Sequence, residues 1–489
     1  MPLSIADQLN HHFFDAFAET DYEYCSAVSP QGLENIRWIS RNHVLADQLG
    51  IDTDLLASQT SLQLMGGCEI SENLKPIAAV YSGHQFGVWA GQLGDGRAIT
   101  LGELAVGKKG ELWDLQLKGA GSTPYSRFAD GRAVLRSSIR EYLCSEAMHG
   151  LGIPTTRALC LIGSDSPVYR EEVETAAVVC RVARSHIRFG SFEHFHYRNN
   201  PDAVKALADY VIERHFPVWV DKSERYLQLL QNTVTKTAHM IAQWQAVGFA
   251  HGVMNTDNMS ILGDTIDYGP FGFMETYKPN FICNHSDTNG RYSFKNQPAI
   301  ALWNLNALAT AFSSLLEREQ LVECLKQYES QFLGHYRALM ASKLGLEEYQ
   351  AQDEELINNL LALMEKNGVD YSLFFRKLSD FSASNASVRD YFFDREKFDL
   401  WAQSYLNRLA SQSTSDTERS KKMRAVNPKY ILRNYMAQTA IERAQEGDYT
   451  EVERLLNIMQ TPFDEHPDAE EYAGLPPDWA AGISVSCSS

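Results

Sequence analysis

Residues 251–272 combine side chains that could transfer a phosphate-containing group. Asp257 and Asn258 are adjacent, and Asp267 follows after a short apolar run. A carboxylate can accept the proton of an attacking hydroxyl, while an amide and a second carboxylate can hold a divalent metal. Mg²⁺ takes oxygen ligands and shares its shell with substrate phosphates. The pattern therefore indicates Asp257 as a base and Asn258 and Asp267 as metal ligands; Asx-rich turns flanking a hairpin are the alternative.

Basic side chains upstream of this segment could neutralise the phosphates of a nucleotide. Lys118 ends a strand with alternating polarity, and Glu141 on the next predicted helix could pair with it. Arg181 and Arg188 could make forked contacts to phosphate oxygens. The alternatives are an ordinary strand-end lysine, a solvated helix glutamate, and structural ion pairs of the arginines with acids such as Glu193.

Two glycine-containing turns could bring backbone N–H groups close to phosphate oxygens. The first contains Gly94, Gly96 and Arg97, and it is also an ordinary hairpin signal. The second contains Asp130 and Gly131. It is predicted to open the helix that carries the partner of the lysine, where N–H groups are available to an anion.

These residues come together only if a β-rich region packs against a helical one. Strands are predicted at 98–101, 111–118, 157–162 and 176–183, and helices at 132–149 and 225–247. Gly248 ends the second helix just before the Asp/Asn segment. Beyond about residue 299 the chain is predicted to be helical, with a polar break at 411–424.

This order of elements predicts an α+β, protein-kinase-like fold of two lobes, a small β-rich N-lobe and a larger helical C-lobe. At 489 residues, the chain exceeds one ordinary core. The predicted regions are an N-terminal extension (1–74), a β-rich nucleotide-binding lobe (75–190), a catalytic helical lobe (191–300), and a helical C-terminal region with a cysteine-containing tail (301–489). Likeness of fold alone assigns no function.

Composition narrows the range of partners. The 44 Lys and Arg against 62 Asp and Glu give a formal net charge of −18, which argues against nucleic acid or an anionic membrane. No apolar run could span a bilayer, and the N-terminus lacks the pattern of a secretory signal. Eight cysteines without Cys-x-x-Cys spacing fit a reduced compartment. We therefore expect a cytoplasmic protein, and a monomer, although the sequence does not fix the oligomeric state.

Read together, the motifs resemble the selenoprotein O family, called YdiU in bacteria. The resemblance covers nearly the whole chain, through residues 83–87, 94–97, 116–119, 121–127, 130–132, 140–142, 145–148, 251–258, 267–273, 283–287, 427–430 and 486–489. It implies a pseudokinase that binds ATP in a flipped orientation and transfers AMP to protein hydroxyl groups. Bacterial members are also linked to UMP transfer from UTP, with Mg²⁺ or Mn²⁺.

The resemblance also implies roles for single residues. Asp257 would accept the proton, Asn258 and Asp267 would bind the metal, and Glu141 would hold Lys118. The residues that would bind the nucleotide are Gly94, Gly96, Arg97, Lys118, Asp130, Gly131, Arg181, Arg188 and Asp267. Client proteins modified on Ser, Thr or Tyr would be the partners, and pyrophosphate would be released.

The catalytic segment departs from that of protein kinases. In kinases four residues separate the base from the metal-binding asparagine, whereas Asp257 and Asn258 are adjacent. A kinase that transfers the γ-phosphoryl group and a non-catalytic nucleotide-binding scaffold are the alternatives. The sequence does not choose between ATP and UTP or between Mg²⁺ and Mn²⁺, and it names no client.

Cys487 lies third from the end of the chain, between serines. An inert terminal thiol is the ordinary interpretation. Because eukaryotic relatives carry selenocysteine at this place, the resemblance suggests a reversible disulfide with Cys283 that would hold the tail near the catalytic segment. Cytosolic disulfides are mostly transient and regulatory, which is compatible with this hypothesis.

Overall fold

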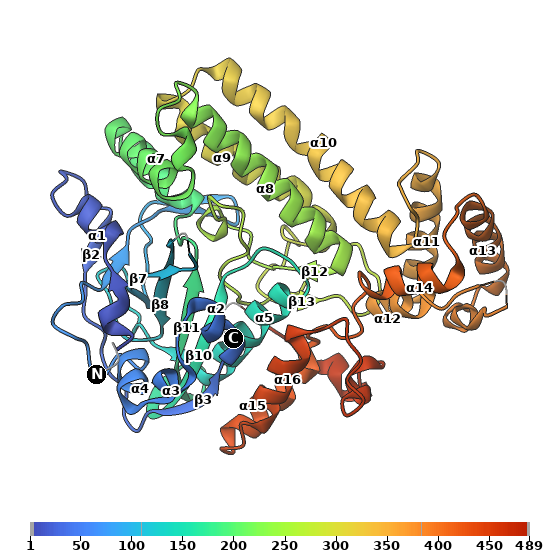
Figure 1. The fold of residues 1–489 in the computed structure, drawn as a ribbon, viewed down its shortest axis with the longest axis horizontal. Coiled ribbons are helices and arrows are strands. Elements are labelled where there is room, and N and C mark those ends of the chain that lie inside the picture. The colour runs from blue at the N-terminus through green and yellow to red at the C-terminus, as the bar shows by residue number, and fades with distance from the viewer. Residues whose placement is uncertain (1–3, 109, 383, 487–489) are drawn as a thin grey trace.

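The computed structural model describes residues 4–108, 110–382 and 384–486, with a sheet in its N-terminal part (Figure 1). The strands of this sheet are β1 (Leu9–Asn10), β2 (Cys25–Ala27), β3 (Arg37–Arg41), β4 (Ile77–Ala79), β7 (Ala98–Val106), β8 (Glu111–Lys118), β9 (Ala133–Val134), β10 (Arg157–Tyr169) and β11 (Val173–Ala183). Within the described residues the order is β2-β4-β7-β8-β11-β10-β3, with β1 on β7 and β9 on β11. All of these pairs are antiparallel. Two small two-stranded sheets lie outside it: the hairpin of β5 (Gly83–Gln85) with β6 (Val88–Ala90), and β12 (Phe249–Ala250) with β13 (Gly272–Phe273).

Helices dominate the rest of the chain. They are α1 (His12–Phe17), α2 (His43–Leu49), α3 (Thr53–Ala57), α4 (Gln59–Met65), α5 (Leu135–Gly150), α6 (Phe189–His196), α7 (Pro201–His215), α8 (Arg225–Val247), α9 (Gln297–Ala311), α10 (Arg318–Lys343), α11 (Asp353–Asn367), α12 (Tyr371–Leu378), α13 (Arg395–Ala410), α14 (Asp416–Arg424), α15 (Asn434–Gln445) and α16 (Thr450–Gln460). In Figure 1, α8, α9 and α10 pack side by side, with α11 to α14 beyond one end. In the described parts of the chain no helix is long and apolar enough to cross a membrane. This mixed architecture is compatible with two lobes, and the kinase-like assignment stays a prediction.

The first 74 residues are built into the β-rich region. They supply β1, β2 and β3, which pair with β7, β4 and β10. Leu45 of α2 and Leu62 of α4 belong to the same buried cluster as Leu115 and Leu117 of β8. This segment therefore stabilises the sheet that carries the basic residues of the site. The predicted region boundaries stay predictions.

Both faces of β8 are covered, which explains the burial of its polar side chains. The alternation predicted there places Leu115 and Leu117 in the apolar cluster. On the opposite face, Lys118 contacts Glu141 of α5. Glu141 is 1% exposed, so the alternative of a solvated helix glutamate is wrong.

Two predicted boundaries differ from the structure. The predicted helix 132–149 begins only at Leu135, because Ala133 and Val134 first pair with β11 as strand β9. The turn at residues 130–131 therefore does not open α5. The predicted polar break at 411–424 contains α14, whose N-cap Ser415 accepts a hydrogen bond from Glu418 N. Its acids lie in the first turn and its bases in the last, so its charges favour the helix.

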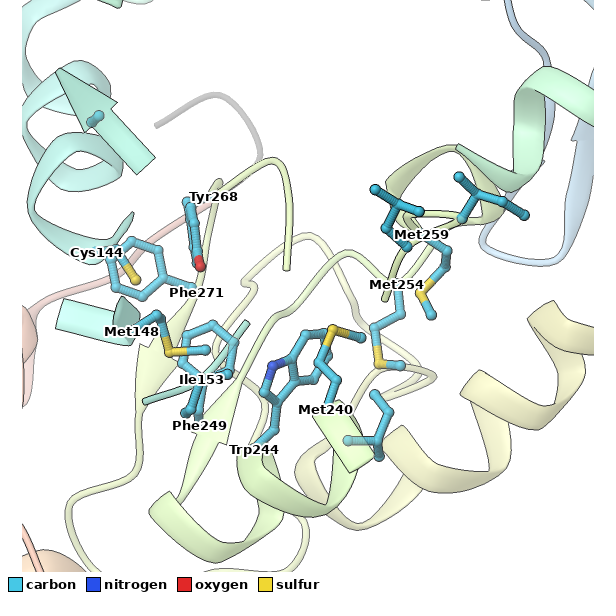
Figure 2. Packing of buried hydrophobic residues seen from close by; sticks show 14 of the residues in the cluster. Cys144, Met148, Ile153, Met240, Trp244, Phe249, Met254, Met259, Tyr268 and Phe271 are labelled. Atoms are coloured by element: carbon cyan, nitrogen blue, oxygen red, sulfur yellow. The ribbon is translucent and has the colours of Figure 1, made fainter. Parts of the chain in front are cut away.

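The long helix predicted at 225–247 is confirmed as α8, and Gly248 ends it in the left-handed conformation with φ of 75°. Figure 2 shows Trp244 of α8 between an apolar group that includes Phe249 and a second one that includes Met254 and Met259. The Trp244 indole donates to Thr265 Oγ1 at 3.0 Å. Residues 251–272, the candidate catalytic segment, are thus packed against the core.

Candidate nucleotide-binding and catalytic site

A cavity of about 760 Å³ lies between the sheet and the catalytic segment. All residues predicted to bind the nucleotide or the metal, and the predicted base, line it: Gly94, Gly96, Arg97, Lys118, Asp130, Gly131, Arg181, Arg188, Asp257, Asn258 and Asp267. Glu141 lies behind Lys118 rather than in the lining. The structure thus brings together residues that are up to 173 positions apart, from Gly94 to Asp267.

A buried ion cluster forms one wall. Lys118 Nζ donates to Glu141 Oε2, and Arg181 Nε donates to Glu141 Oε1 at 2.5 Å. Burial is the largest influence on the pKa of Glu141 and favours the neutral acid, but the charges of Arg181 and Lys118 outweigh it and lower the pKa. Burial lowers the pKa of Lys118 to about 8, against the opposing effect of Glu141. The cluster therefore keeps an excess of positive charge beside the cavity.

Asp267 connects this cluster to Arg188. Its Oδ1 lies 2.9 Å from Arg181 Nη2, and its Oδ2 accepts from Arg188 Nη1. Burial favours the neutral acid, but Arg188, Arg181 and Lys118 overcome this effect and lower the pKa of Asp267. Its backbone is left-handed, with φ of 60°, a strained conformation that is common at functional sites. The arginines pair with this acid and with Glu141, not with Glu193, which contacts His84 Nδ1 instead.

Asp257 lies in the short 3-10 turn η3 (Thr256–Asn258). Gln85 Nε2 donates to its Oδ2 at 3.1 Å, and Arg188 Nη1 donates to its backbone oxygen at 2.7 Å. Within the described residues, its buried Oδ1 has no hydrogen-bond partner. Burial is the main cause that raises the pKa of Asp257 to about 6. A carboxylate that binds a proton this readily is suited to accept one during a reaction.

The donors beside Asp257 fit a hard divalent metal. Asn258 Nδ2 donates to Val253 O at 2.9 Å, and its Oδ1 makes no hydrogen bond in the part of the chain that the structure describes. Asp267 could share its carboxylate oxygens, which have further lone pairs, between arginine and metal. Across the described ranges there is no group of three or more His, Cys, Asp or Glu that could hold a metal. A site of one amide and one carboxylate, completed by substrate phosphates, would contain no such group.

The hairpin of β5 and β6 covers Asp257, a role that the sequence reasoning missed. A Cβ at Gly83 would lie 2.6 Å from Asp257 Oδ1, so only glycine allows this approach. His84 N donates to Thr256 Oγ1 at 2.7 Å, which fixes the hairpin on the catalytic turn. The glycines of the 83–87 motif were the available signal, because they mark places where backbone comes close to another group.

The two predicted glycine turns both pack against residues 121–126. Gly94 has φ of 132°, and a Cβ there would lie 2.5 Å from Tyr125 Cγ. Thr123 Oγ1 donates to Asp95 O at 2.7 Å, and Gly121 N donates to Gly131 O at 3.3 Å, so the segment 121–126 connects the turns. The Asp130 carboxylate pairs with Arg170 at 2.8 Å, and Arg170 also lines the cavity.

Cys283 lies close to the catalytic segment, where its Sγ is 3.4 Å from Ala250 O. Its predicted partner Cys487 lies outside the described residues. The disulfide therefore stays a prediction.

A cationic cavity that faces carboxylates is the arrangement that phosphate transfer from a nucleotide requires. The chain belongs to the family described as "Protein adenylyltransferase SelO", which it matches over residues 7–460. This confirms the predicted family and makes the chain a member of a family of nucleotide-transferring enzymes.

Individual relatives agree with the family. The chain is 50% identical over 482 residues to "Protein nucleotidyltransferase YdiU" of Pectobacterium carotovorum subsp. carotovorum (strain PC1), covering 98% of each chain. It is 52% identical over 463 residues to the protein of the same name from Aliivibrio salmonicida (strain LFI1238), covering 94% of this chain and 95% of the relative.

Glu141→Gln is expected to lower the free energy of unfolding by about 3 kcal/mol, because buried Lys118 and Arg181 would lose their shared anion. Nucleotide transfer should fall at least about tenfold as the two cations lose their fixed positions. Urea unfolding and a transfer assay measure the two effects. Glu146→Gln is the matched control, since Glu146 lies on the same helix, is buried and pairs with Arg157 at 2.7 Å, but does not line the cavity. Equal losses of transfer in both variants would contradict the positioning role of Glu141.

Proposed function

We propose that this protein transfers AMP from ATP, or UMP from UTP, to Ser, Thr or Tyr hydroxyl groups of client proteins and releases pyrophosphate. The observation that carries the proposal is that buried Asp257 and the cations Lys118, Arg181 and Arg188 line one cavity. An acceptor for a hydroxyl proton and a set of charges for phosphates thus face the same cavity. We further propose that it acts as a cytoplasmic monomer and binds neither nucleic acid nor membrane.

In the proposed reaction, the client hydroxyl oxygen forms a bond to the α-phosphorus. The bond from that phosphorus to the oxygen bridging the α- and β-phosphates breaks, and pyrophosphate leaves with the electron pair. Asp257 accepts the hydroxyl proton, while the Gln85 amide holds the carboxylate in place. Lys118, Arg181 and Arg188 stabilise the charge that develops on the leaving group, so positioning and electrostatics supply most of the rate.

Asn258 and Asp267 would hold Mg²⁺ or Mn²⁺. When bound, the metal supplies positive charge that neutralises phosphate oxygens. The arginines that now engage Asp267 are then within reach of the same phosphates, since all of these side chains line the cavity. The site therefore offers oxygen ligands to the cation and guanidinium groups to the anion.

A paired-label experiment tests the proposal. The purified protein is incubated with a cell extract and with ATP labelled at either the α- or the γ-phosphate, with Mn²⁺ or Mg²⁺, and with EDTA as a control. Label from the α-phosphate is expected on proteins, together with released pyrophosphate, and only when metal is present. Labelled UTP in parallel measures the preference for UMP. Transfer of γ-label would instead indicate a kinase, and no transfer of label from either ATP or UTP would indicate a non-catalytic scaffold.

A further inference from the structure

The inner wall of the cavity suits phosphates, and this restricts where a nucleobase can lie. Lys118, Arg181 and Arg188 are 8%, 4% and 2% exposed, so their charges lie in the buried part of the lining, whereas Arg127 and Arg170 of the lining are exposed. The polyphosphate of a nucleotide binds where the cations are. When the polyphosphate lies against the three buried cations, the uncharged base extends toward the exposed part of the lining, here called the rim. This reasoning rests on the proposed function, since it takes a nucleoside triphosphate as the ligand.

Aromatic side chains of the rim are the natural partners of a flat base. The aromatic residues of the lining are Tyr81, Phe86, Tyr125, Phe128 and Tyr268. The ring of Tyr81 is covered by the Arg188 guanidinium, 4.6 Å from its centroid. Phe86 packs against Tyr292, with ring centroids 5.0 Å apart. These two rings already have partners on one face.

Two further rings are buried, and one is not. Tyr125 packs against Gly94, and Tyr268 donates to or accepts from Thr155 within the core. Phe128 is fully exposed although it lines the cavity. Among the residues that the structure describes, it makes no ring-stacking or cation–π contact. It is therefore the aromatic side chain of the lining with both faces available.

A fixed turn carries the Phe128 ring. Ala129 N donates to Ser126 O at 2.9 Å, and Ser126 Oγ donates to Gly96 O, which ties this turn to the first glycine turn. Arg127 has φ of 55°, a strained conformation for a residue with a side chain. An exposed phenylalanine gives up the burial that would otherwise stabilise the fold. The turn is strained, is held in place by hydrogen bonds, and exposes an aromatic ring at the rim of the cavity. These features are expected of a ligand-binding element.

We propose that Phe128 stacks on the base of the bound nucleoside triphosphate and closes the rim of the cavity. Stacking uses the flat face that every base has, so this contact accepts both adenine and uracil. The larger purine offers more area to the ring, which gives ATP an advantage over UTP. Phe128 is thus a nucleotide-binding residue that contributes to the choice of base.

Equilibrium binding of three probes to Phe128→Ala tests the proposal: ATP, UTP and inorganic tripolyphosphate, which has the charges but no base. We expect the Kd for ATP to rise about tenfold and that for UTP to rise less, while the Kd for tripolyphosphate stays within about twofold. Phe128→Trp should restore ATP binding, because it keeps a stacking ring. Phe393→Ala is the matched control, since Phe393 is 93% exposed but does not line the cavity.

Two results would overturn the inference while leaving the proposed function intact. Equal weakening of ATP and tripolyphosphate binding would show that Phe128 shapes the phosphate site. Unchanged ATP binding with slower transfer to proteins would show that it contacts the client instead. Failure of the unaltered protein to bind either ATP or UTP would overturn the proposed function and this inference together, so the two failures can be told apart.

Discussion

Replacing Asp267 by asparagine is expected to abolish nucleotide transfer, with a loss of kcat/KM of roughly 10³-fold or more. The change preserves size but removes the carboxylate proposed to hold the metal. It should have the opposite effect on anion binding. In the structure this carboxylate engages Arg181 and Arg188, so it would compete with phosphates for both guanidinium groups. In EDTA, the variant is therefore expected to bind tripolyphosphate at least as tightly as the unaltered protein. α-Label transfer and calorimetric binding measure the two effects.

Asp264→Asn is the matched control for this result. Asp264 is 4% exposed and pairs with Arg184 at 2.5 Å, but it does not line the cavity. Its variant should keep both transfer and anion binding. If Asp267→Asn instead retained transfer, or lost tripolyphosphate binding together with transfer, Asp267 would be a structural residue and the metal assignment would be wrong.

The pH dependence of stability gives a further check on Asp267. Its pKa is lowered in the folded protein, so its ion pairs stabilise the fold above the unfolded-state pKa of about 3.9. That stability is lost as the pH falls through the lowered folded-state pKa. Asp267→Asn should therefore have a lower free energy of unfolding than the unaltered protein at pH 7. This difference should become smaller as the pH is lowered.

The components of the site could be predicted from the sequence because their chemistry requires particular side chains. Lys118 and Glu141 are 23 residues apart on a strand and the helix that follows, and their order matches the lysine–glutamate pair of kinases, which suggested their contact. The partners of the arginines could not be predicted in this way. Arg188 meets Asp267 across 79 residues, and only the packing of the catalytic segment against the sheet chooses that acid over nearby Glu193.

Elements and contacts that give no periodic pattern in the sequence were either not predicted or predicted as the wrong structure. Strands β1, β2 and β3 have two to five residues, too few for alternation to identify them, and long-range pairing fixes them in the sheet. Gln85 and Asp257 are 172 residues apart in the sequence, and no pattern of residue spacing predicts their contact. In α14, a highly polar composition concealed a helix that capping and end charges stabilise.

Replacing Asp257 by asparagine is expected to lower transfer by about 10²- to 10⁴-fold, because the acceptor of the hydroxyl proton is lost. The pH dependence of the free energy of unfolding should have the opposite sign to that expected for Asp267. Burial raises the folded-state pKa of Asp257 to about 6, above its unfolded value. The protonated group therefore favours the fold fully below about pH 3.9, and this contribution is lost as the pH rises through about 6. Relative to the variant, the unaltered protein should lose about 2 kcal/mol of unfolding free energy between pH 4 and pH 7.5, measured by urea denaturation in EDTA.

Asp264→Asn again separates the base from an ordinary buried acid. Burial also raises the pKa of Asp264, so this variant should show a pH trend of the same sign without the loss of transfer. In the unaltered protein, kcat/KM should rise as the pH increases through about 6, because the base must be deprotonated to accept a proton. Asp257→Asn should have little activity throughout that range. Transfer by Asp257→Asn within tenfold of the unaltered protein would show that another group, or water, accepts the proton.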